Sequence, residues 1–348
     1  MARPKRASSG LGIPKRVTMQ DIADAAGVHV MTVSNALGNV RGVAPATREK
    51  VLQIARELNY IPNSAARALV VGRTGTIALV CGAVNEPYYA HMAYYLESNV
   101  AEDGYKLTLL RRPHDVIDLI NETGKVPVDG AIAIDMYHWA DQFRAHPTVP
   151  CVAVGTYEHK LLDYVVVDLS LAVEQALRIM MEQGRQRIAY IVDAPQLSLP
   201  TEVRARTYLD VMQRAGRQPE IIDIYTEEVN TKIISVTRRR LHAHFQQHGF
   251  PDALFCLNDE IAMCAYRVLR DSGRRVPEDV LLVGCDGQPH MEYFDPPLST
   301  VAQPMEAMCA LAWRFLRQRM DDPTLPLQQV TLQGTLTATE SLLVPTSR

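Results

Sequence analysis

The hydrophobic pattern at the start of the chain predicts short helices separated by a tight turn. Residues 18–26 begin with Thr18 and Asp21 in capping-box spacing and continue with apolar residues on one face. Gly27 follows, and because glycine tolerates a positive φ, it predicts the turn. Residues 28–37 then carry a second apolar stripe at helical spacing, made of Val33, Ala36 and Leu37.

The second predicted helix carries an ordered but largely polar outer face. Residues outside its stripe are Val30, Met31, Thr32, Ser34 and Asn35. Two helices joined by a short glycine turn, with one face buried and the N-terminal outer face presented, are typical of a helix-turn-helix that enters the major groove. A third helix is expected from Thr47, its predicted cap, with an apolar face of Val51, Ile54, Ala55 and Leu58.

After residue 73, strand-like apolar runs alternate with amphipathic helical stretches. Continuously apolar runs such as TIALVCG, GAIAI, CVAVG, IAYIV and VLLVG predict parallel strands that are covered on both faces. Helices are expected near residues 88–103, 114–123, 139–145, 170–183, 202–215, 231–247, 259–272 and 305–320. So many βα units predict two similar sheets, with a ligand cleft at the carboxyl ends of the strands.

The charge of the chain is unevenly distributed. Residues 1–73 hold eleven Lys/Arg and four Asp/Glu, whereas the whole chain has a formal net charge of −3. A basic head on an acidic body indicates that only the head meets a polyanion. The run Arg238, Arg239 and Arg240 is interpreted as a solvated face or an intersubunit salt-bridge site. The sequence shows no membrane-length apolar run, no secretory signal and six scattered cysteines, so we expect reduced thiols and a cytoplasmic location.

Several motifs resemble one family of bacterial regulators. MQDIADAAGVHVMTVSNALG, TREKVLQIARELNYIPN and AARAL resemble the DNA-binding head and hinge of the LacI/GalR repressors. GTIALV, VDGAIAI, LFCLNDEIAMCAYRVLRDSGRRVPEDVLLVGCDG and PPLSTVAQP resemble the strands, effector-domain signature and return crossover of their core. The resemblance covers nearly the whole chain after Arg16. It implies an α/β protein with an all-α helix-turn-helix head, a hinge helix and a two-subdomain, periplasmic-binding-protein-like effector core.

The resemblance also implies a division of the chain into domains. Residues 1–16 are expected to be a disordered basic extension, 17–62 the DNA-binding domain and 63–72 the hinge helix. Residues 73–348 then form the effector-binding and dimerisation core. Its N-subdomain is expected at about 73–184 and 302–320, and its C-subdomain at about 185–301 and 321–348.

Residues for DNA contact follow from the outer face of the second helix and from the family's pattern. They are Thr18, Val30, Met31, Thr32, Ser34, Asn35, Asn63, Ala66 and Leu69. Val30 and Met31 match the family's variable specificity positions, and being apolar they favour thymine methyl groups. Many relatives have arginine at the position of Asn35. Because asparagine suits an adenine edge, we expect it to contact adenine rather than guanine. Leu69 matches the hinge leucine that wedges into the minor groove.

Effector contacts are expected from polar residues that follow strands. They are Asp135, Asp168, Arg206, Asn258, Asp259, Asp286 and Tyr88. In the family the matching positions hydrogen-bond an effector that is often a sugar or a purine. Arg204 is expected instead at the surface or behind the site.

Local roles remain open for several of these residues. Asn258 and Asp259 could equally cap a helix, and Asp168 could cap a helix or bridge the subdomains. Tyr88 or its neighbour Tyr89 could stack on a ring ligand or merely cover the core.

The predicted function is that of a transcription regulator, a repressor that acts as a homodimer on pseudo-palindromic double-stranded operator DNA under control of a small effector. Two alternatives are a solute-binding protein with the same two-lobed fold and a sugar- or nucleotide-modifying enzyme. The 70-residue head and the missing signal peptide argue against the first. The lack of a GxGxxG after a strand, a P-loop and a GxSxG elbow argues against the second. His244 and His248 are spaced for a shared metal but have no third ligand, so no metal, cofactor or membrane partner is expected.

Overall fold

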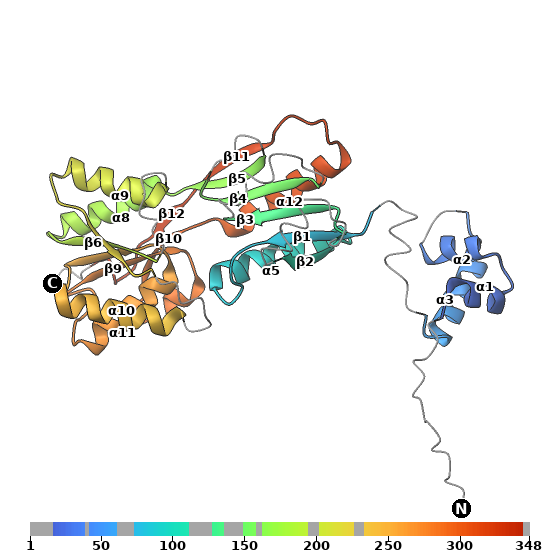
Figure 1. Ribbon diagram of the computed structural model, residues 1–348, viewed down its shortest axis with the longest axis horizontal. Helices are drawn as coiled ribbons and strands as arrows, with labels where there is room; N and C mark the ends of the chain where they lie inside the picture. The colour runs from blue at the N-terminus through green and yellow to red at the C-terminus, as the bar shows by residue number, and fades with distance from the viewer. Residues whose placement is uncertain are drawn as a thin grey trace, which may run out of the picture. The chain divides into compact units, whose positions relative to one another are not determined.

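The chain divides into two units, Met1–Thr74 and Gly75–Arg348. The computed structural model in Figure 1 describes residues 17–38, 42–60, 73–110, 127–135, 149–157, 162–193, 202–225 and 233–343. Outside the described residues lie the expected N-terminal extension, the hinge at 63–72, and the expected helices near 114–123 and 139–145. The predictions for those segments therefore stay predictions.

The first unit contains the three predicted helices α1 (Met19–Ala26), α2 (Val30–Leu37) and α3 (Pro45–Glu57). The capping box is confirmed, because the Thr18 backbone N–H donates to Asp21 Oδ2 at 2.7 Å and the Asp21 backbone N–H donates to Thr18 Oγ1 at 3.3 Å. Gly27 has a φ of 65°, as the predicted turn requires. The helices share a small core of Ile22, Ala23, Ala26, Val33, Ala36, Val51 and Ala55.

Three details of the head differ from prediction. The third helix starts at Pro45 after Ala44, which makes no side-chain cap, so Thr47 is not its N-cap. Proline is favoured at the first helical position because its missing N–H would have no partner there. Val30, expected on the outer face, packs partly against the head core, whereas Leu58, expected inside, is 36% exposed beyond the end of α3.

The first sheet of the core has the strand order β11-β5-β4-β3-β1-β2, and all its pairs are parallel. Its strands are β1 (Thr76–Val80), β2 (Lys106–Leu110), β3 (Gly130–Ile134), β4 (Cys151–Gly155), β5 (Asp163–Asp168) and β11 (Gln329–Gln333). Helix α5 (Pro87–Glu102) packs on β2, and α12 (Met305–Asp321) packs on β3, β4 and β5.

The second sheet has the order β12-β10-β9-β8-β6-β7, with β12 antiparallel to β10 and the other pairs parallel. Its strands are β6 (Ile188–Val192), β7 (Glu220–Asp223), β8 (Ala253–Cys256), β9 (Leu281–Asp286), β10 (Ser299–Ala302) and β12 (Thr335–Thr337). Around it lie α8 (Ser170–Glu182), α9 (Val203–Arg214), α10 (Ile233–His248) and α11 (Asp259–Asp271) (Figure 1). The 3₁₀ helix η2 (Pro289–Tyr293) follows β9 along the chain. The two-sheet α/β prediction is confirmed.

In the part of the chain that the structure describes, three crossings join the two sheets, and they differ from the predicted boundaries. Helix α8 was expected in the first subdomain but packs on α9, β10 and β12 of the second. Strand β11 was expected in the second subdomain but pairs with β5 of the first. Apolar periodicity identifies each element without indicating which of two similar sheets it joins. The crossings pack closely, since a Cβ on Gly334 would lie 2.4 Å from Leu169 Cδ2 and 3.2 Å from the Ala302 carbonyl oxygen.

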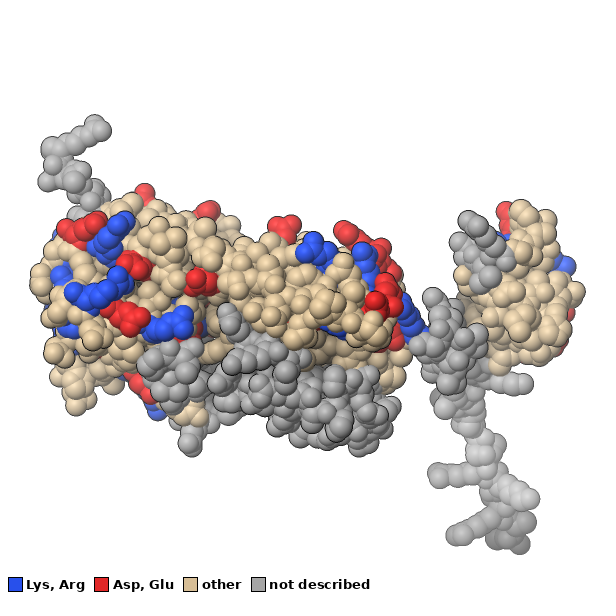
Figure 2. Space-filling model, turned by 90° about the horizontal axis from the view of Figure 1, so that it is seen from above, with Lys and Arg blue, Asp and Glu red and all other residues tan. Residues whose placement is uncertain are grey.

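The surface of the core carries charges of both signs. Figure 2 shows Lys/Arg and Asp/Glu side chains intermingled over the core, and exposed pairs such as Arg267–Asp271 join them at 2.9 Å. Arg238, Arg239 and Arg240 are exposed, as the interpretation of this run as a solvated face requires. All six cysteines are free and buried, as predicted. Within the described residues, no helix is long and apolar enough to cross a membrane.

Candidate functional site

The outer face of α2 is the first candidate site. Met31 is 61% exposed, and its backbone N–H donates to Nδ1 of the helix-capping His29 at 3.3 Å. Thr32, Ser34 and Asn35 are half-buried at the edge of the same face. The side chains of α2 that are predicted to contact DNA therefore lie around the exposed Met31 side chain. The predicted hinge contacts Asn63, Ala66 and Leu69 lie outside the described residues.

One hydrogen bond joins α3 to the end of α2, and another caps α1. Arg48 on α3 donates from Nη1 to the Ala36 carbonyl oxygen at 3.0 Å, near the end of α2. The Thr18 hydroxyl donates to Asp21 Oδ2 at 2.6 Å, so the structure gives Thr18 a capping role. The outer face of α2 is therefore supported by the small core of the head and by the hydrogen bond from α3.

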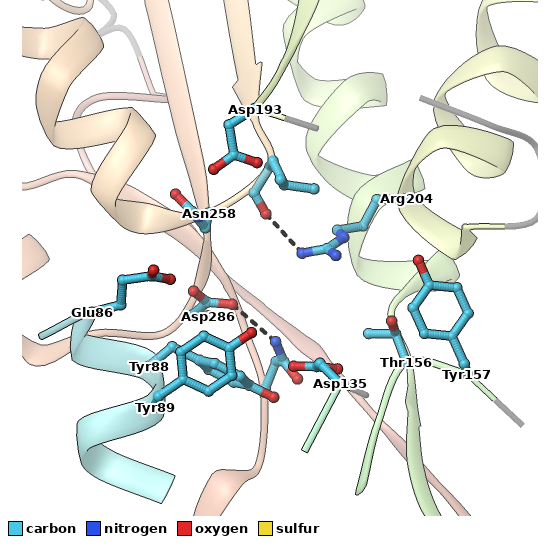
Figure 3. A pocket seen from close by; sticks show the side chains of 12 residues that line it. Glu86, Tyr88, Tyr89, Asp135, Thr156, Tyr157, Asp193, Arg204, Asn258 and Asp286 are labelled. Atoms are coloured by element: carbon cyan, nitrogen blue, oxygen red, sulfur yellow. Dashed lines mark hydrogen bonds between the residues drawn. The ribbon is translucent and has the colours of Figure 1, made fainter. Parts of the chain in front are cut away.

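The second candidate site is a pocket at the carboxyl ends of strands from both sheets. Its volume is about 230 Å³, slightly below the range of about 300–1,000 Å³ for drug-sized ligands, which suits a small molecule. Figure 3 shows side chains from both subdomains converging on it. The lining consists of Glu86, Tyr88, Tyr89, Asp135, Thr156, Tyr157, Asp193, Arg204, Leu257, Asn258, Asp286 and Gln303.

The first subdomain contributes the start of α5 and the ends of β3 and β4. Tyr88 is 9% exposed, and its hydroxyl has no hydrogen-bond partner among the described residues. Asp135 follows β3 with a φ of 53°, a conformation that L-residues rarely adopt. A Cβ on Gly155 would lie 2.1 Å from Asp135 Oδ1, so only glycine at this position leaves room for the carboxylate.

Arginine enters the pocket at a position other than the predicted one. Arg204 is buried, donating from Nε to Glu202 Oε1 at 2.8 Å and from Nη1 to the Leu257 carbonyl oxygen at 2.8 Å. Arg206 is exposed and is not in the lining, so both the Arg206 and the Arg204 predictions were wrong. Since α9 begins at Val203, two residues of helix turn the chain by about 200° and reverse the face.

Asp286 sits at the floor of the pocket, held by residues from neighbouring strands. Gln303 donates from Nε2 to Asp286 Oδ1 at 2.9 Å, and Asp286 has a φ of 126°. Asp259, also predicted to touch the effector, is fully buried outside the lining. There it accepts from Thr300 Oγ1 at 2.7 Å and from the Gln288 backbone N–H at 2.7 Å. Asp259 thus supports the floor of the pocket from behind.

Two other predicted residues serve as helix or turn caps. Asn258 Oδ1 accepts from the Ile261 backbone N–H at 2.8 Å, and the residue also lines the pocket, so both of its expected roles are compatible. Asp168 accepts from the Ser170 backbone N–H at 2.9 Å and lies outside the lining. Although burial opposes its charge, the hydrogen bonds from Ser170 lower the pKa of Asp168.

Burial shifts the protonation of the pocket acids. It raises the pKa of Asp135 to about 6, against the charge of Arg204, which acts to lower it. Burial, followed by the charge of Asp259, raises the pKa of Asp286 well above its ordinary value. The pKa of Asp193 is also raised by burial. These carboxyl groups are therefore poorly compensated by the protein around them.

The sequence prediction missed several lining residues, although one signal pointed to them. Asp193 directly follows IAYIV, Thr156 and Tyr157 follow CVAVG, and Gln303 follows STVA. All stand at strand ends, where the ligand rule for open α/β sheets applies. Glu86 and Leu257 carry no comparable signal, since helix starts and strand extensions are common everywhere.

Comparisons with known proteins agree with both candidate sites. Residues 18–63 match the family described as bacterial regulatory proteins, lacI family, and residues 177–342 match a periplasmic binding protein-like domain. The HTH-type transcriptional regulator CelR of Thermobifida fusca is 32% identical over 341 residues, covering 94% of this chain and 98% of the relative.

Two solved structures extend the comparison. The structure of a transcriptional regulator CelR–cellobiose complex is 28% identical, covers 94% of this chain and 100% of the other, and gives a TM-score of 0.66. A structure of the lac repressor dimer bound to operator and the anti-inducer ONPF is 22% identical and covers 95% of this chain and 100% of the other. Its TM-score of 0.79 supports the fold. Relatives that match this chain over both the head and the core are named as transcriptional regulators. This finding favours the regulator prediction over the solute-binding protein and the enzyme. The chain is a transcriptional regulator and belongs to the lacI family of bacterial regulatory proteins.

Proposed function

We propose that this protein is a cytoplasmic repressor that binds a pseudo-palindromic operator as a homodimer and changes its operator affinity when a small polyhydroxylated effector enters the pocket. One observation carries this proposal. A single chain joins a helix-turn-helix with an exposed recognition face to a polar pocket lined from both sheets of a two-subdomain core. Relatives named as regulators and repressors, one of them complexed with cellobiose, support it.

Contacts to the effector would come from the groups that face the pocket. Arg204 keeps Nη2 without an acceptor among the described residues, so it can donate to a ligand oxygen. Asp135 can accept from hydroxyl groups, and Tyr157 offers an aromatic face. A ligand held by residues of both subdomains would shift the equilibrium between open and closed cores.

The crossings between the sheets would couple effector binding in the pocket to DNA binding by the heads. Gln303 touches Asp286 in the pocket and precedes α12 of the first subdomain, so ligand contacts bear directly on a crossing. The hinge at 63–72, with Leu69 as the proposed minor-groove wedge, would pass closure to the two heads. Met31 and Val30 would read bases in successive major grooves.

Selection from random double-stranded DNA, followed by fluorescence anisotropy with the selected site, tests the first half of the proposal. We expect a two-fold symmetric consensus bound far more tightly than random DNA. Titrating candidate sugars into that complex tests the second half, because a true effector changes operator affinity.

Arg204→Lys and Arg206→Lys form a matched pair for the pocket. Lysine keeps the charge but loses the planar fork, so Arg204→Lys should abolish the response while operator affinity without ligand stays unchanged. Arg206→Lys should respond like the wild type. An equal response from both variants would contradict the pocket assignment, and selection of an asymmetric or random consensus would contradict the operator assignment.

A further inference from the structure

The pocket is strongly unbalanced in charge. Four carboxyl side chains line it, namely Glu86, Asp135, Asp193 and Asp286, whereas Arg204 is the one cationic side chain in the described lining. The Arg204 charge is already paired, because its Nε donates to the fully buried Glu202 at 2.8 Å. The pocket therefore gathers several carboxyl groups around a single cation whose charge is already paired.

Polar atoms in the pocket also lack partners. The Tyr88 hydroxyl and the Gln303 Oε1 atom are buried and have no hydrogen-bond partner among the described residues. Asp286 accepts from Gln303 Nε2 at 2.9 Å, so the Gln303 Oε1 atom stays directed at the pocket. A buried polar group without a partner is costly, so these atoms indicate where a ligand supplies hydrogen bonds.

Three kinds of small ligand can be compared against this lining. A phosphate ester or carboxylate would add negative charge beside four carboxyl groups, where attraction from Arg204 is already offset by Glu202. A neutral sugar would satisfy donors and acceptors but would not offset the cost of ionising the buried carboxyl groups. An ammonium group offers three donors and a positive charge, and the raised pKa values of Asp135, Asp193 and Asp286 would fall when it binds.

We infer that the pocket selects a polyhydroxylated ligand that bears an ammonium group, of which an amino sugar is the simplest class. The hydroxyl groups match Arg204, Tyr88 and Gln303, and the ammonium group lies among the carboxyl groups of Asp135, Asp193 and Asp286. This inference rests on the proposed effector site and adds the charge of its ligand.

Matched ligand series with the full-length protein, without DNA, test the inference. Glucosamine, galactosamine and mannosamine are each compared with the parent hexose and its 6-phosphate by isothermal titration calorimetry. We expect at least one amino sugar to bind about tenfold tighter than its parent, and the phosphates to show no binding. Asp135→Asn and Asp193→Asn should bring that amino sugar toward its parent, whereas Asp210→Asn, an exposed carboxylate on α9, should not.

The outcomes separate this inference from the proposed function. Tighter binding of a parent sugar or a phosphate, or no binding of any amino sugar at millimolar concentration, would overturn the charge selection. Amino-sugar binding that leaves operator affinity unchanged would uphold the ligand class and contradict the regulatory proposal. An undiminished preference in both Asp→Asn variants would show that the carboxyl groups do not set the selection.

Discussion

The head and the pocket hold their functional side chains in opposite ways. On α2, Met31 projects into solvent beside half-buried neighbours, and the small core beneath shapes this surface. In the pocket, Asp135 and Asp286 sit at unusual backbone angles, and Arg204 is fixed by buried partners. Substitution on the exposed face of α2 should therefore change recognition without changing stability, whereas substitution in the pocket should change both.

Arg204→Ala should give the largest effect on stability. Its ion pair with Glu202 is nearly fully buried, with side chains 9% and 0% exposed, so removing the arginine leaves an uncompensated buried carboxylate. We expect the free energy of unfolding to fall by about 3 kcal/mol in urea denaturation. The exposed Arg206→Ala control should stay within about 0.5 kcal/mol of the wild type. Equal losses in both variants would remove the contrast between buried and exposed positions on α9.

Two glycines give a paired test of the same comparison. A Cβ on Gly284 would lie 2.2 Å from Asp259 Oδ1 and 2.9 Å from Met291 Cε, so Gly284→Ala should destabilise the core by about 2 kcal/mol. A Cβ on Gly27 in the head would meet nothing within 4 Å, and only its φ of +65° opposes alanine, costing about 1 kcal/mol. Calorimetry of the core transition and hydrogen exchange of head amides measure the two effects. A larger loss at Gly27 would argue against a crowded pocket floor.

The pH dependence of stability should reveal the buried acid behind the pocket. Burial raises the pKa of Asp259 in the folded protein to about 6, above about 3.9 in an unfolded chain. The folded state thus binds this proton more tightly than the unfolded state does. The ionised Asp259 carboxylate therefore destabilises the fold fully above about pH 6, and this destabilisation fades as the pH falls toward about 4. Between pH 7 and pH 5, the wild type should gain about 1 kcal/mol relative to Asp259→Asn. Urea unfolding at both pH values measures this difference, and a constant difference would contradict it.

Met31→Gln should have the smallest effect on stability, within about 0.5 kcal/mol, because the side chain is exposed. It should nevertheless change the selected operator, since an amide favours an adenine edge over a thymine methyl. Leu52→Gln, another exposed apolar residue of the head on α3, serves as the control and should select the wild-type site. Selection of the unchanged operator by Met31→Gln would mean that this face of α2 does not read bases.

Sequence patterns predicted the elements well and their partners poorly. Apolar periodicity predicted a helix at 170–183, close to the observed Ser170–Glu182, because it reflects burial on one face. It could not assign α8 to a sheet, since both sheets bury similar faces. The strand-end rule located Asp135 and Asp286, but the choice between Arg204 and Arg206 depended on where α9 begins. A shift of two residues at a helix start exchanges the buried and exposed faces, and local sequence rarely fixes that start.

The three crossings also set the order in which the protein can be completed during synthesis. The first sheet gains its edge strand β11 only at Gln329–Gln333, and the second gains β12 at Thr335–Thr337. The head closes its core with contacts among residues 17–60, so it can fold while most of the chain is still unmade. Translation that stops before β11 would therefore give a folded head joined to two incomplete sheets. Such a fragment would bind DNA without control by a ligand.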